Sequence, residues 1–125
     1  MTTLLVVDDD ATIRGLYARA LAKLGDVEQA GNGAAALEAL AARPFDAITL
    51  DLHMPNVDGF KVLQNLRATA GPNRSTPVVV ITADPHDKAR VDAFEGGAML
   101  YLQKPVPLAS LVTMVRMALS KARVR

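Results

Sequence analysis

Short apolar runs in this sequence end in polar side chains, and the first run ends in three adjacent aspartates. Residues 4–7 are apolar, and Asp8, Asp9 and Asp10 follow at once. A fourth acid, Asp51, follows another apolar run. Carboxylates that lie close together raise each other's pKa unless a cation joins them. Oxygen ligands with room left for water suit Mg²⁺, so the acids predict a magnesium site if the fold brings them together.

A hydroxyl group and an ammonium group follow two later apolar runs. Thr82 comes after residues 77–81, and Lys104 comes shortly after residues 99–102. Both groups can bind an anion that shares the metal, which together describes phosphoryl transfer. A carboxylate can serve as the nucleophile and form an acyl phosphate. We predict Asp51 as the acceptor because it stands alone at the end of a buried strand.

Alternating strands and helices must position these residues. Five apolar runs predict strands, and five stretches of helical periodicity predict helices, with Gly25 at the C-terminal end of the first helix. The predicted strands cover residues 4–7, 27–30, 45–50, 77–81 and 99–102, and the helices cover 12–24, 34–43, 59–70, 86–95 and 108–121. Gly96 and Gly97 are predicted to end the fourth helix, and helical spacing places Leu108 on the buried side of the last. Strict alternation with short connections predicts one doubly wound α/β domain over residues 1–125. In such folds, sites form beyond the carboxyl ends of the strands.

Composition narrows the class of protein. Half of the 125 residues are hydrophobic, and the net charge of +1 gives no field that would favour nucleic acid or a membrane surface. The chain has no cysteine, which removes disulfides and thiolate chemistry. No apolar run approaches the roughly 18 residues of a membrane span. We therefore expect a cytoplasmic protein that does not bind nucleic acid directly or insert into a membrane.

Four short motifs resemble the receiver domain of two-component response regulators, in order and over the whole chain. They are VVDDD at 6–10, LDLHMPNVDGF at 50–60, VVVITA at 78–83 and YLQKP at 101–105. The resemblance implies a flavodoxin-like fold with five helices and a five-stranded parallel sheet of order 2-1-3-4-5.

The resemblance also implies a role for each matching position. Asp51 would be the phosphoacceptor. Asp9 would bind Mg²⁺ directly, Asp8 would act largely through bound water, and the backbone carbonyl of His53 would be a third protein ligand.

Three further positions would respond to the phosphoryl group. The hydroxyl of Thr82 would follow it, the ammonium of Lys104 would pair with a phosphate oxygen, and Tyr101 would turn inward. The Lys104–Pro105 peptide would be cis.

The implied partners are proteins. A sensor histidine kinase or a histidine phosphotransfer protein would donate the phosphoryl group, and the domain would catalyse its own phosphorylation and dephosphorylation. An unidentified downstream protein would receive the signal, and a homodimer is compatible with the family. Candidate output contacts are Ala89, Ala93 and Phe94 of the fourth helix and Met114 of the last, although core packing is the preferred role for Phe94.

Some side chains have two interpretations. His53 and Asp84 lie two residues after Asp51 and Thr82, where this family borders the path of the water that hydrolyses the acyl phosphate. They are otherwise solvated surface residues. Asp10 either caps the helix that follows or adds to the acidic cluster, and capping is favoured.

Three other functions compete with this interpretation of the sequence. Residues 31–36, GNGAAA, fit a dinucleotide-binding fingerprint, but they follow the second strand, and the simpler interpretation is a turn before an alanine-rich helix. A phosphatase with an aspartyl nucleophile would need a second acid at the position of His53. A phosphorylation-independent interaction module of the same fold remains the main alternative, although it would not need the acids, Thr82 and Lys104.

Overall fold

The computed structural model describes residues 2–54 and 57–123. Strands and helices alternate along the chain, as the apolar periodicity predicted. The strands are β1 (Thr3–Val7), β2 (Asp26–Ala30), β3 (Ala47–Leu50), β4 (Val78–Thr82) and β5 (Leu100–Gln103). The helices are α1 (Ala11–Leu21), α2 (Gly33–Ala42), α3 (Gly59–Ala68), α4 (Asp87–Glu95) and α5 (Leu108–Arg123). Most predicted boundaries differ from these by one to three residues.

All five strands belong to one parallel sheet of order β2-β1-β3-β4-β5, which confirms the doubly wound fold. Every residue of β3 and β4 is buried, and so are four of the five residues of β1. These strands show no polar alternation because helices cover both of their faces. The edge strand β5 is only half-buried along most of its length.

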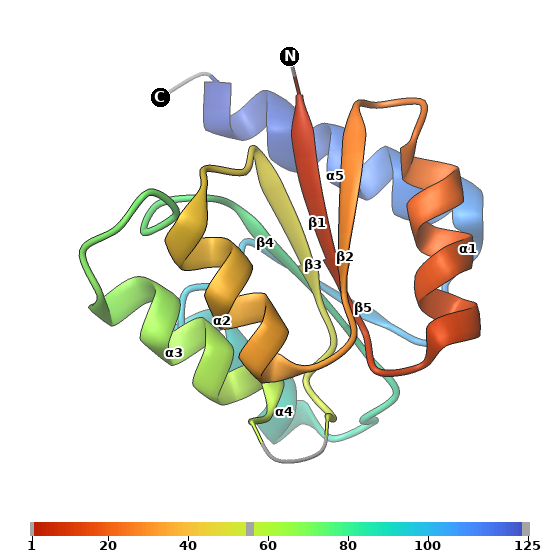
Figure 1. Cartoon of the computed structure of the whole chain (residues 1–125). Coiled ribbons are helices and arrows are strands. Elements are labelled where there is room, and N and C mark those ends of the chain that lie inside the picture. Colours follow the sequence, from red (N-terminus) through yellow and green to blue (C-terminus); the bar gives the residue numbers. More distant parts are fainter. Residues whose placement is uncertain (1, 55–56, 124–125) are drawn as a thin grey trace.

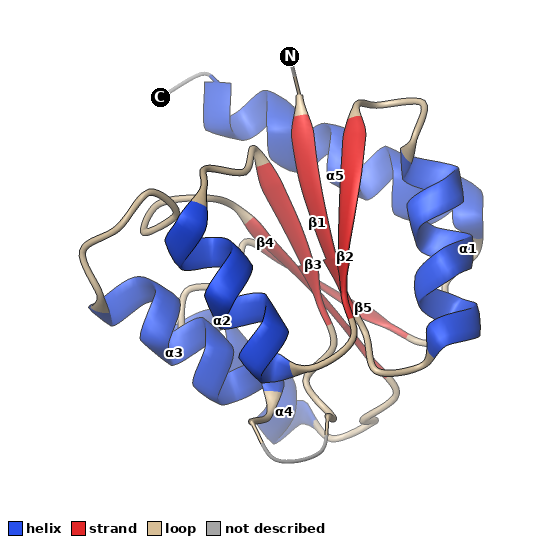
Figure 2. Ribbon diagram, viewed as in Figure 1, coloured by secondary structure: helices blue, strands red, loops and turns tan. Residues whose placement is uncertain are grey.

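Helices α1 and α5 cover one face of the sheet, and α2, α3 and α4 cover the other (Figures 1 and 2). One apolar core lies under α1 and α5 and includes Leu21 and Val115. The second lies under the other three helices and includes Leu63 and Ala93. The two cores pack against opposite faces of the sheet and so hold in place the strand ends from which the loops start. Those loops gather at the lower edge in Figure 1.

Local side chains define where the helices begin and end. The carboxylate of Asp10 accepts hydrogen bonds from the N–H groups of Thr12 and Ile13, so the predicted N-cap of α1 is confirmed. Asp58 caps α3 through the N–H of Lys61. Among the glycines of the described segments, Gly97 alone has a positive φ, 106°, and it ends α4 as predicted.

Gly25 does not have the predicted role. Helix α1 ends at Leu21, four residues before it, and Gly25 does not adopt a left-handed backbone conformation. A Cβ at this position would lie 2.3 Å from the carbonyl oxygen of Thr2, so close packing against the start of β1 requires glycine instead.

Four surface assignments are also corrected. Ala89 and Ala93 are buried against the sheet and cannot serve as output contacts. Phe94 is 46% exposed rather than part of the core, and Leu108 is 40% exposed although helical spacing placed it inward. Phe94 directly follows the fully buried Ala93 and points to a different side of α4, and Leu108 is the first residue of α5.

A buried polar network holds the opposite edge of the sheet, before β3 and β4. The side-chain oxygen of Asn73 accepts from the N–H of Phe45 at 2.7 Å, and its amide donates to the carbonyls of Leu40 and Arg43 at 2.8 and 2.7 Å. Thr76 donates to this same Asn73 oxygen and to the carbonyl of Phe45. The loop after α3 is thereby fixed to the end of α2.

Candidate metal and phosphoryl-acceptor site

The predicted site residues meet at the carboxyl edge of the sheet. Asp8 follows β1, Asp51 follows β3, Thr82 ends β4, and Lys104 follows β5. Three of these polar side chains are almost fully buried: Asp8 is 2% exposed, Asp51 5% and Thr82 0%. Buried charges require partners, so the groups around them determine what this edge can do.

Three carboxylates form a cluster that could hold a metal ion. One oxygen each from Asp8, Asp9 and Asp51 lies within 4.8 Å of the others, and these are the carboxylates that the family resemblance implied as ligands. Asp9 is exposed, so one side of the cluster is open to water. An all-oxygen donor set with an open side fits Mg²⁺, which keeps several of its waters.

Lys104 is the ammonium group nearest to these acids. Its Nζ donates to Asp8 Oδ2 at 2.8 Å and to Asp51 Oδ2 at 3.2 Å. The N–H of Lys104 donates to the carbonyl of Thr82 at 2.8 Å, which holds its backbone beside the end of β4. The Lys104–Pro105 peptide is cis, as the family resemblance implied. One ammonium therefore bridges two buried carboxylates.

This single ammonium does not compensate the acids completely. Burial raises the pKa of Asp51 above its usual range, against the opposing effects of the His53 N–H and of Lys104, and the nearby charge of Asp8 adds to the rise. Burial alone would lower the pKa of Lys104, but its hydrogen bond to Asp8 and the charges of Asp51 and Asp8 raise it overall. The site holds more negative charge than it neutralises, which is the electrostatic condition for binding a cation.

Backbone N–H groups orient the two buried acids. The N–H of His53 donates to Asp51 Oδ1 at 3.1 Å, and the N–H of Asp10 donates to Asp8 Oδ1 at 2.9 Å. In each acid one oxygen binds backbone and the other binds Lys104. Gly59 also packs against this strand end, because a Cβ there would lie 2.3 Å from the carbonyl oxygen of Asp51. Gly59 therefore allows α3 to begin in close contact with the end of the acceptor strand, and its backbone does not adopt a left-handed conformation.

The two predicted switch residues converge on Asp84. The N–H of Asp84 donates to the hydroxyl oxygen of Thr82 at 3.3 Å, and its carbonyl accepts from the hydroxyl of Tyr101 at 3.3 Å. The ring of Tyr101 lies 6.4 Å from that of Phe94, at an angle of 45°. Thr82 and Tyr101 are therefore connected through one loop residue.

Two residues near the site had no role in the sequence-based prediction. Arg14 Nη1 donates to the carbonyl oxygen of Asp8 at 2.8 Å, which supports the first strand end. His86 binds the carboxylate of Asp84 through both its N–H and its ring. Neither belongs to one of the four motifs, so only its position one turn into α1 or just after β4 could have pointed to it.

The dinucleotide-like stretch at 31–36 has a structural role. Asn32 caps α2, its side-chain oxygen accepting from the N–H of Ala35 at 2.8 Å. Gly33 is required because a Cβ there would lie 2.2 Å from the carbonyl oxygen of Val57. The simpler interpretation, a turn before an alanine-rich helix, is confirmed.

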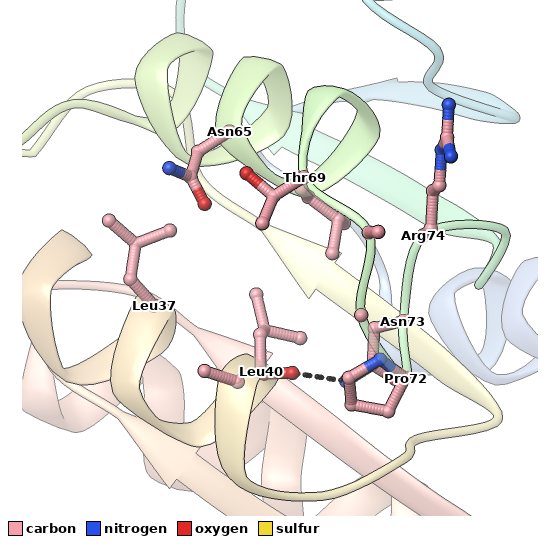
Figure 3. A pocket seen from close by; sticks show the side chains of 11 residues that line it. Leu37, Leu40, Asn65, Thr69, Pro72, Asn73 and Arg74 are labelled. Atoms are coloured by element: carbon pink, nitrogen blue, oxygen red, sulfur yellow. Dashed lines mark hydrogen bonds between the residues drawn. The ribbon is translucent and has the colours of Figure 1, made fainter.

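A small cavity of about 150 Å³ lies away from the acids, between α2, α3 and the loop after α3 (Figure 3). Leu37 and Leu40 line one side, and Asn65 and Thr69 line the other. Asn73 reaches its inner wall and donates to the carbonyl of Leu40. None of the acidic site residues borders it.

Comparison with known proteins identifies the class to which this fold and site belong. The family model "Response regulator receiver domain" matches residues 4–116. The chain therefore belongs to the receiver domains of response regulators, the signalling domains of two-component systems, as the four motifs predicted.

Two curated relatives illustrate the match. The chain is 38% identical over 121 residues to the response regulator MprA of Mycobacterium ulcerans, covering 96% of this chain and 51% of that protein. It is also 38% identical over 116 residues to the DNA-binding transcriptional regulator NtrC of Escherichia coli K12, covering 92% of this chain and 24% of NtrC. The chain thus spans about half or less of the length of these relatives.

Solved structures of similar fold cover nearly the whole chain. The receiver domain of the Francisella response regulator 1452 aligns with a TM-score of 0.88 at 27% identity, covering 98% of this chain and 99% of that one. The BeF3-activated DrrB receiver domain aligns with a TM-score of 0.86 at 28% identity, covering 96% and 98%. In the described part of the chain, no helix combines the length and apolar character needed to cross a membrane.

Proposed function

We propose that this domain accepts a phosphoryl group on Asp51 from a phosphohistidine donor, with Mg²⁺ bound at the acidic cluster. The observation that carries the proposal is the buried Asp51 beside Asp8 and Asp9, with one ammonium for the two buried acids. Asp9 would bind the ion directly, Asp8 largely through water, and the His53 carbonyl would complete the protein ligands. When bound, Mg²⁺ supplies charge neutralisation for the phosphoryl oxygens.

The phosphoryl transfer exchanges one bond to phosphorus for another. An oxygen of Asp51 forms a bond to phosphorus, the phosphorus–nitrogen bond to the donor imidazole breaks, and the imidazole leaves with its electron pair and takes up a proton. Later hydrolysis returns the carboxylate and releases phosphate. The N–H of His53 holds Asp51 Oδ1, and Lys104 is already within 3.2 Å of Oδ2, so neither group needs to travel far.

The response would begin at Thr82 and Lys104. A phosphoryl group on Asp51 adds negative charge and acceptor oxygens beside a buried hydroxyl and a paired ammonium. Lys104 would exchange a carboxylate partner for a phosphoryl oxygen. Thr82 would turn its hydroxyl toward the same group and so give up its present bond with Asp84. Tyr101, bound to the same residue, would move in consequence.

The donor would dock on an apolar groove that begins at Lys104 and runs between α1 and the start of α5. Ile13 and Leu16 of α1 and Leu108 of α5 line it. Leu16 and Leu108 are 42% and 40% exposed, although both are large apolar side chains. A donor protein docked on this groove would lie beside Lys104 and would bury both leucines.

The downstream partner would bind on the other side of Tyr101. Val91 and Phe94 of α4 are 49% and 46% exposed, and Phe94 contacts the ring of Tyr101. Val91 and Phe94 replace Ala89 and Ala93 as candidate output contacts. The half-buried Met114 of α5 remains a further candidate. The same surface could form a homodimer.

The acceptor assignment is tested by labelling with a small phosphodonor such as phosphoramidate. With Mg²⁺, the wild-type domain should gain one acid-stable, base-labile phosphoryl group, and Asp51→Asn should gain none. Asp46→Asn, an exposed acid at the opposite edge of the sheet, is the control and should be labelled normally. Equal labelling of wild type and Asp51→Asn would refute the acceptor, and an unlabelled wild type would favour the phosphorylation-independent interaction module.

A further inference from the structure

Asp9 is the one carboxylate of the acidic cluster that is not held through its own side chain. Asp8 and Asp51 each have one oxygen bound by a backbone N–H and the other bound by Lys104. Within residues 2–54 and 57–123, the carboxylate of Asp9 makes no hydrogen bond or ion pair, and the residue is exposed. The place of Asp9 in the cluster therefore depends on the backbone that carries it.

Arg14 of α1 binds the peptide group that joins Asp8 to Asp9. Its Nη1 donates to the carbonyl oxygen of Asp8 at 2.8 Å, and its Nε donates to Oε1 of Gln29 on β2 at 3.2 Å. The N–H of Asp8 in turn donates to the carbonyl of Ala30 at 3.2 Å. A guanidinium holds its donors in a rigid planar fork, so two bonds from one group fix orientation as well as distance. The peptide from which Asp9 projects is thereby held relative to both strands.

Gly31 leaves the space that this guanidinium occupies. A Cβ at position 31 would lie 2.9 Å from Nη1 of Arg14 and 3.4 Å from its Cζ. These atoms are the far end of a flexible side chain, so an alanine at this position would displace the guanidinium and leave the backbone in place. Gly31 does not adopt a left-handed backbone conformation, so its own geometry does not require glycine. The first glycine of the dinucleotide-like stretch therefore accommodates Arg14.

We propose that Arg14 is a positioning residue for the metal site, which acts by fixing the Asp8–Asp9 peptide and needs glycine at position 31 to do so. The inference rests on the proposed Mg²⁺ site. Charge and geometry predict opposite effects of losing Arg14. A cation close to the acids repels Mg²⁺, so by charge alone its removal would tighten Mg²⁺ binding. Because Arg14 keeps Asp9 in the cluster, its removal weakens Mg²⁺ binding instead.

The test measures the dissociation constant of Mg²⁺ by NMR titration of the unphosphorylated domain. Arg14→Gln should weaken Mg²⁺ binding about ten-fold, the lower end of the range for groups that orient metal ligands. Arg14→Lys, which keeps the charge but not the fork, should also weaken it. Gly31→Ala should weaken binding and add nothing in the Arg14→Gln background, because it acts through the same guanidinium.

The matched control is Arg19→Gln, which removes an exposed cation from the same helix. Arg19 forms no ion pair with any residue that the structure describes, so its loss should leave the Mg²⁺ dissociation constant unchanged. Unchanged or tighter Mg²⁺ binding in Arg14→Gln would overturn the proposal, and so would additive effects of Arg14→Gln and Gly31→Ala.

A second readout needs no metal. The amide nitrogen of Asp9 belongs to the same peptide as the Asp8 carbonyl, so its chemical shift responds to the hydrogen bond from Arg14. Without Mg²⁺, Arg14→Gln and Gly31→Ala should move this signal in the same direction, and Arg19→Gln should not move it. An Asp9 signal that is unchanged in Arg14→Gln would overturn the proposal. A wild type that binds no Mg²⁺ would refute the proposed function and with it the metal role of Arg14, whereas normal binding in Arg14→Gln refutes this inference alone.

Discussion

Both edges of the sheet bury polar side chains, but the two sets differ in hydrogen bonding and in charge. At the amino edge, Asn73 and Thr76 satisfy one another and the backbone of two loops. At the carboxyl edge, Asp8 and Asp51 share one ammonium, and burial raises the pKa of Asp51. The first network has every donor matched to an acceptor, whereas the second is short of positive charge.

The difference separates a structural site from a chemical one. A neutral network with matched hydrogen bonds stabilises the fold and offers nothing to a ligand. A buried site with excess negative charge costs stability by itself and gains it when a cation binds. The polar residues of the amino edge therefore hold the loops, and those of the carboxyl edge form the proposed site for an ion and a phosphoryl group.

Removing Asn73 should cause the largest loss of stability. Asn73→Ala leaves the N–H of Phe45 and the carbonyls of Leu40 and Arg43 without these partners in a buried place. We expect the free energy of unfolding to fall by about 3 kcal/mol, measured by urea denaturation. Asn65→Ala is the control, because Asn65 is an exposed helical residue and its loss should change stability by no more than about 0.5 kcal/mol. Similar losses in the two variants would mean that the amino-edge network is not structural.

Neutralising Asp51 should have a smaller effect of opposite sign. Without Mg²⁺ at neutral pH, Asp51→Asn should raise the free energy of unfolding, because it removes a buried charge that Lys104 does not fully compensate.

The pH dependence follows from the raised pKa of Asp51. The folded protein holds this proton to higher pH than the unfolded chain, whose carboxyl titrates near 3.8. The destabilising contribution of Asp51 is therefore absent below that value and grows as the pH rises through the folded pKa. The advantage of Asp51→Asn over wild type should grow over the same range in urea denaturation at a series of pH values. If the difference in free energy of unfolding between Asp51→Asn and wild type does not change with pH, the carboxyl edge does not carry the uncompensated charge that distinguishes it from the amino edge.

The sequence predicted most of the carboxyl edge and little of the amino edge. Asp8, Asp51, Thr82 and Lys104 each follow an apolar run, and parallel strands bring such positions together whatever the details of packing. The strand order came from the family motifs. The Asp10 cap could be predicted because it depends on residues three positions apart at most.

The remaining features depend on contacts between distant residues. Asn73 bonds to residues about thirty positions away along the chain, and nothing in its local sequence shows this. Gly25 is fixed by contact with Thr2 rather than by its own helix. The sequence favoured a core position for both Leu108 and Phe94, and both are exposed, because helical spacing does not show where the neighbouring elements stop. The His53–Asp84 pair combines two positions that sequence reasoning treated separately.

We propose that the excess of acid at the carboxyl edge holds a divalent ion beside Asp51. The most direct test is urea unfolding of wild type and Asp9→Asn with Mg²⁺ or with NaCl of equal ionic strength. At a hundred times its dissociation constant, Mg²⁺ should stabilise wild type by about 2.7 kcal/mol, and Asp9→Asn should lose most of this gain while Asn73→Ala keeps it. No gain in wild type, or a full gain in Asp9→Asn, would contradict the account.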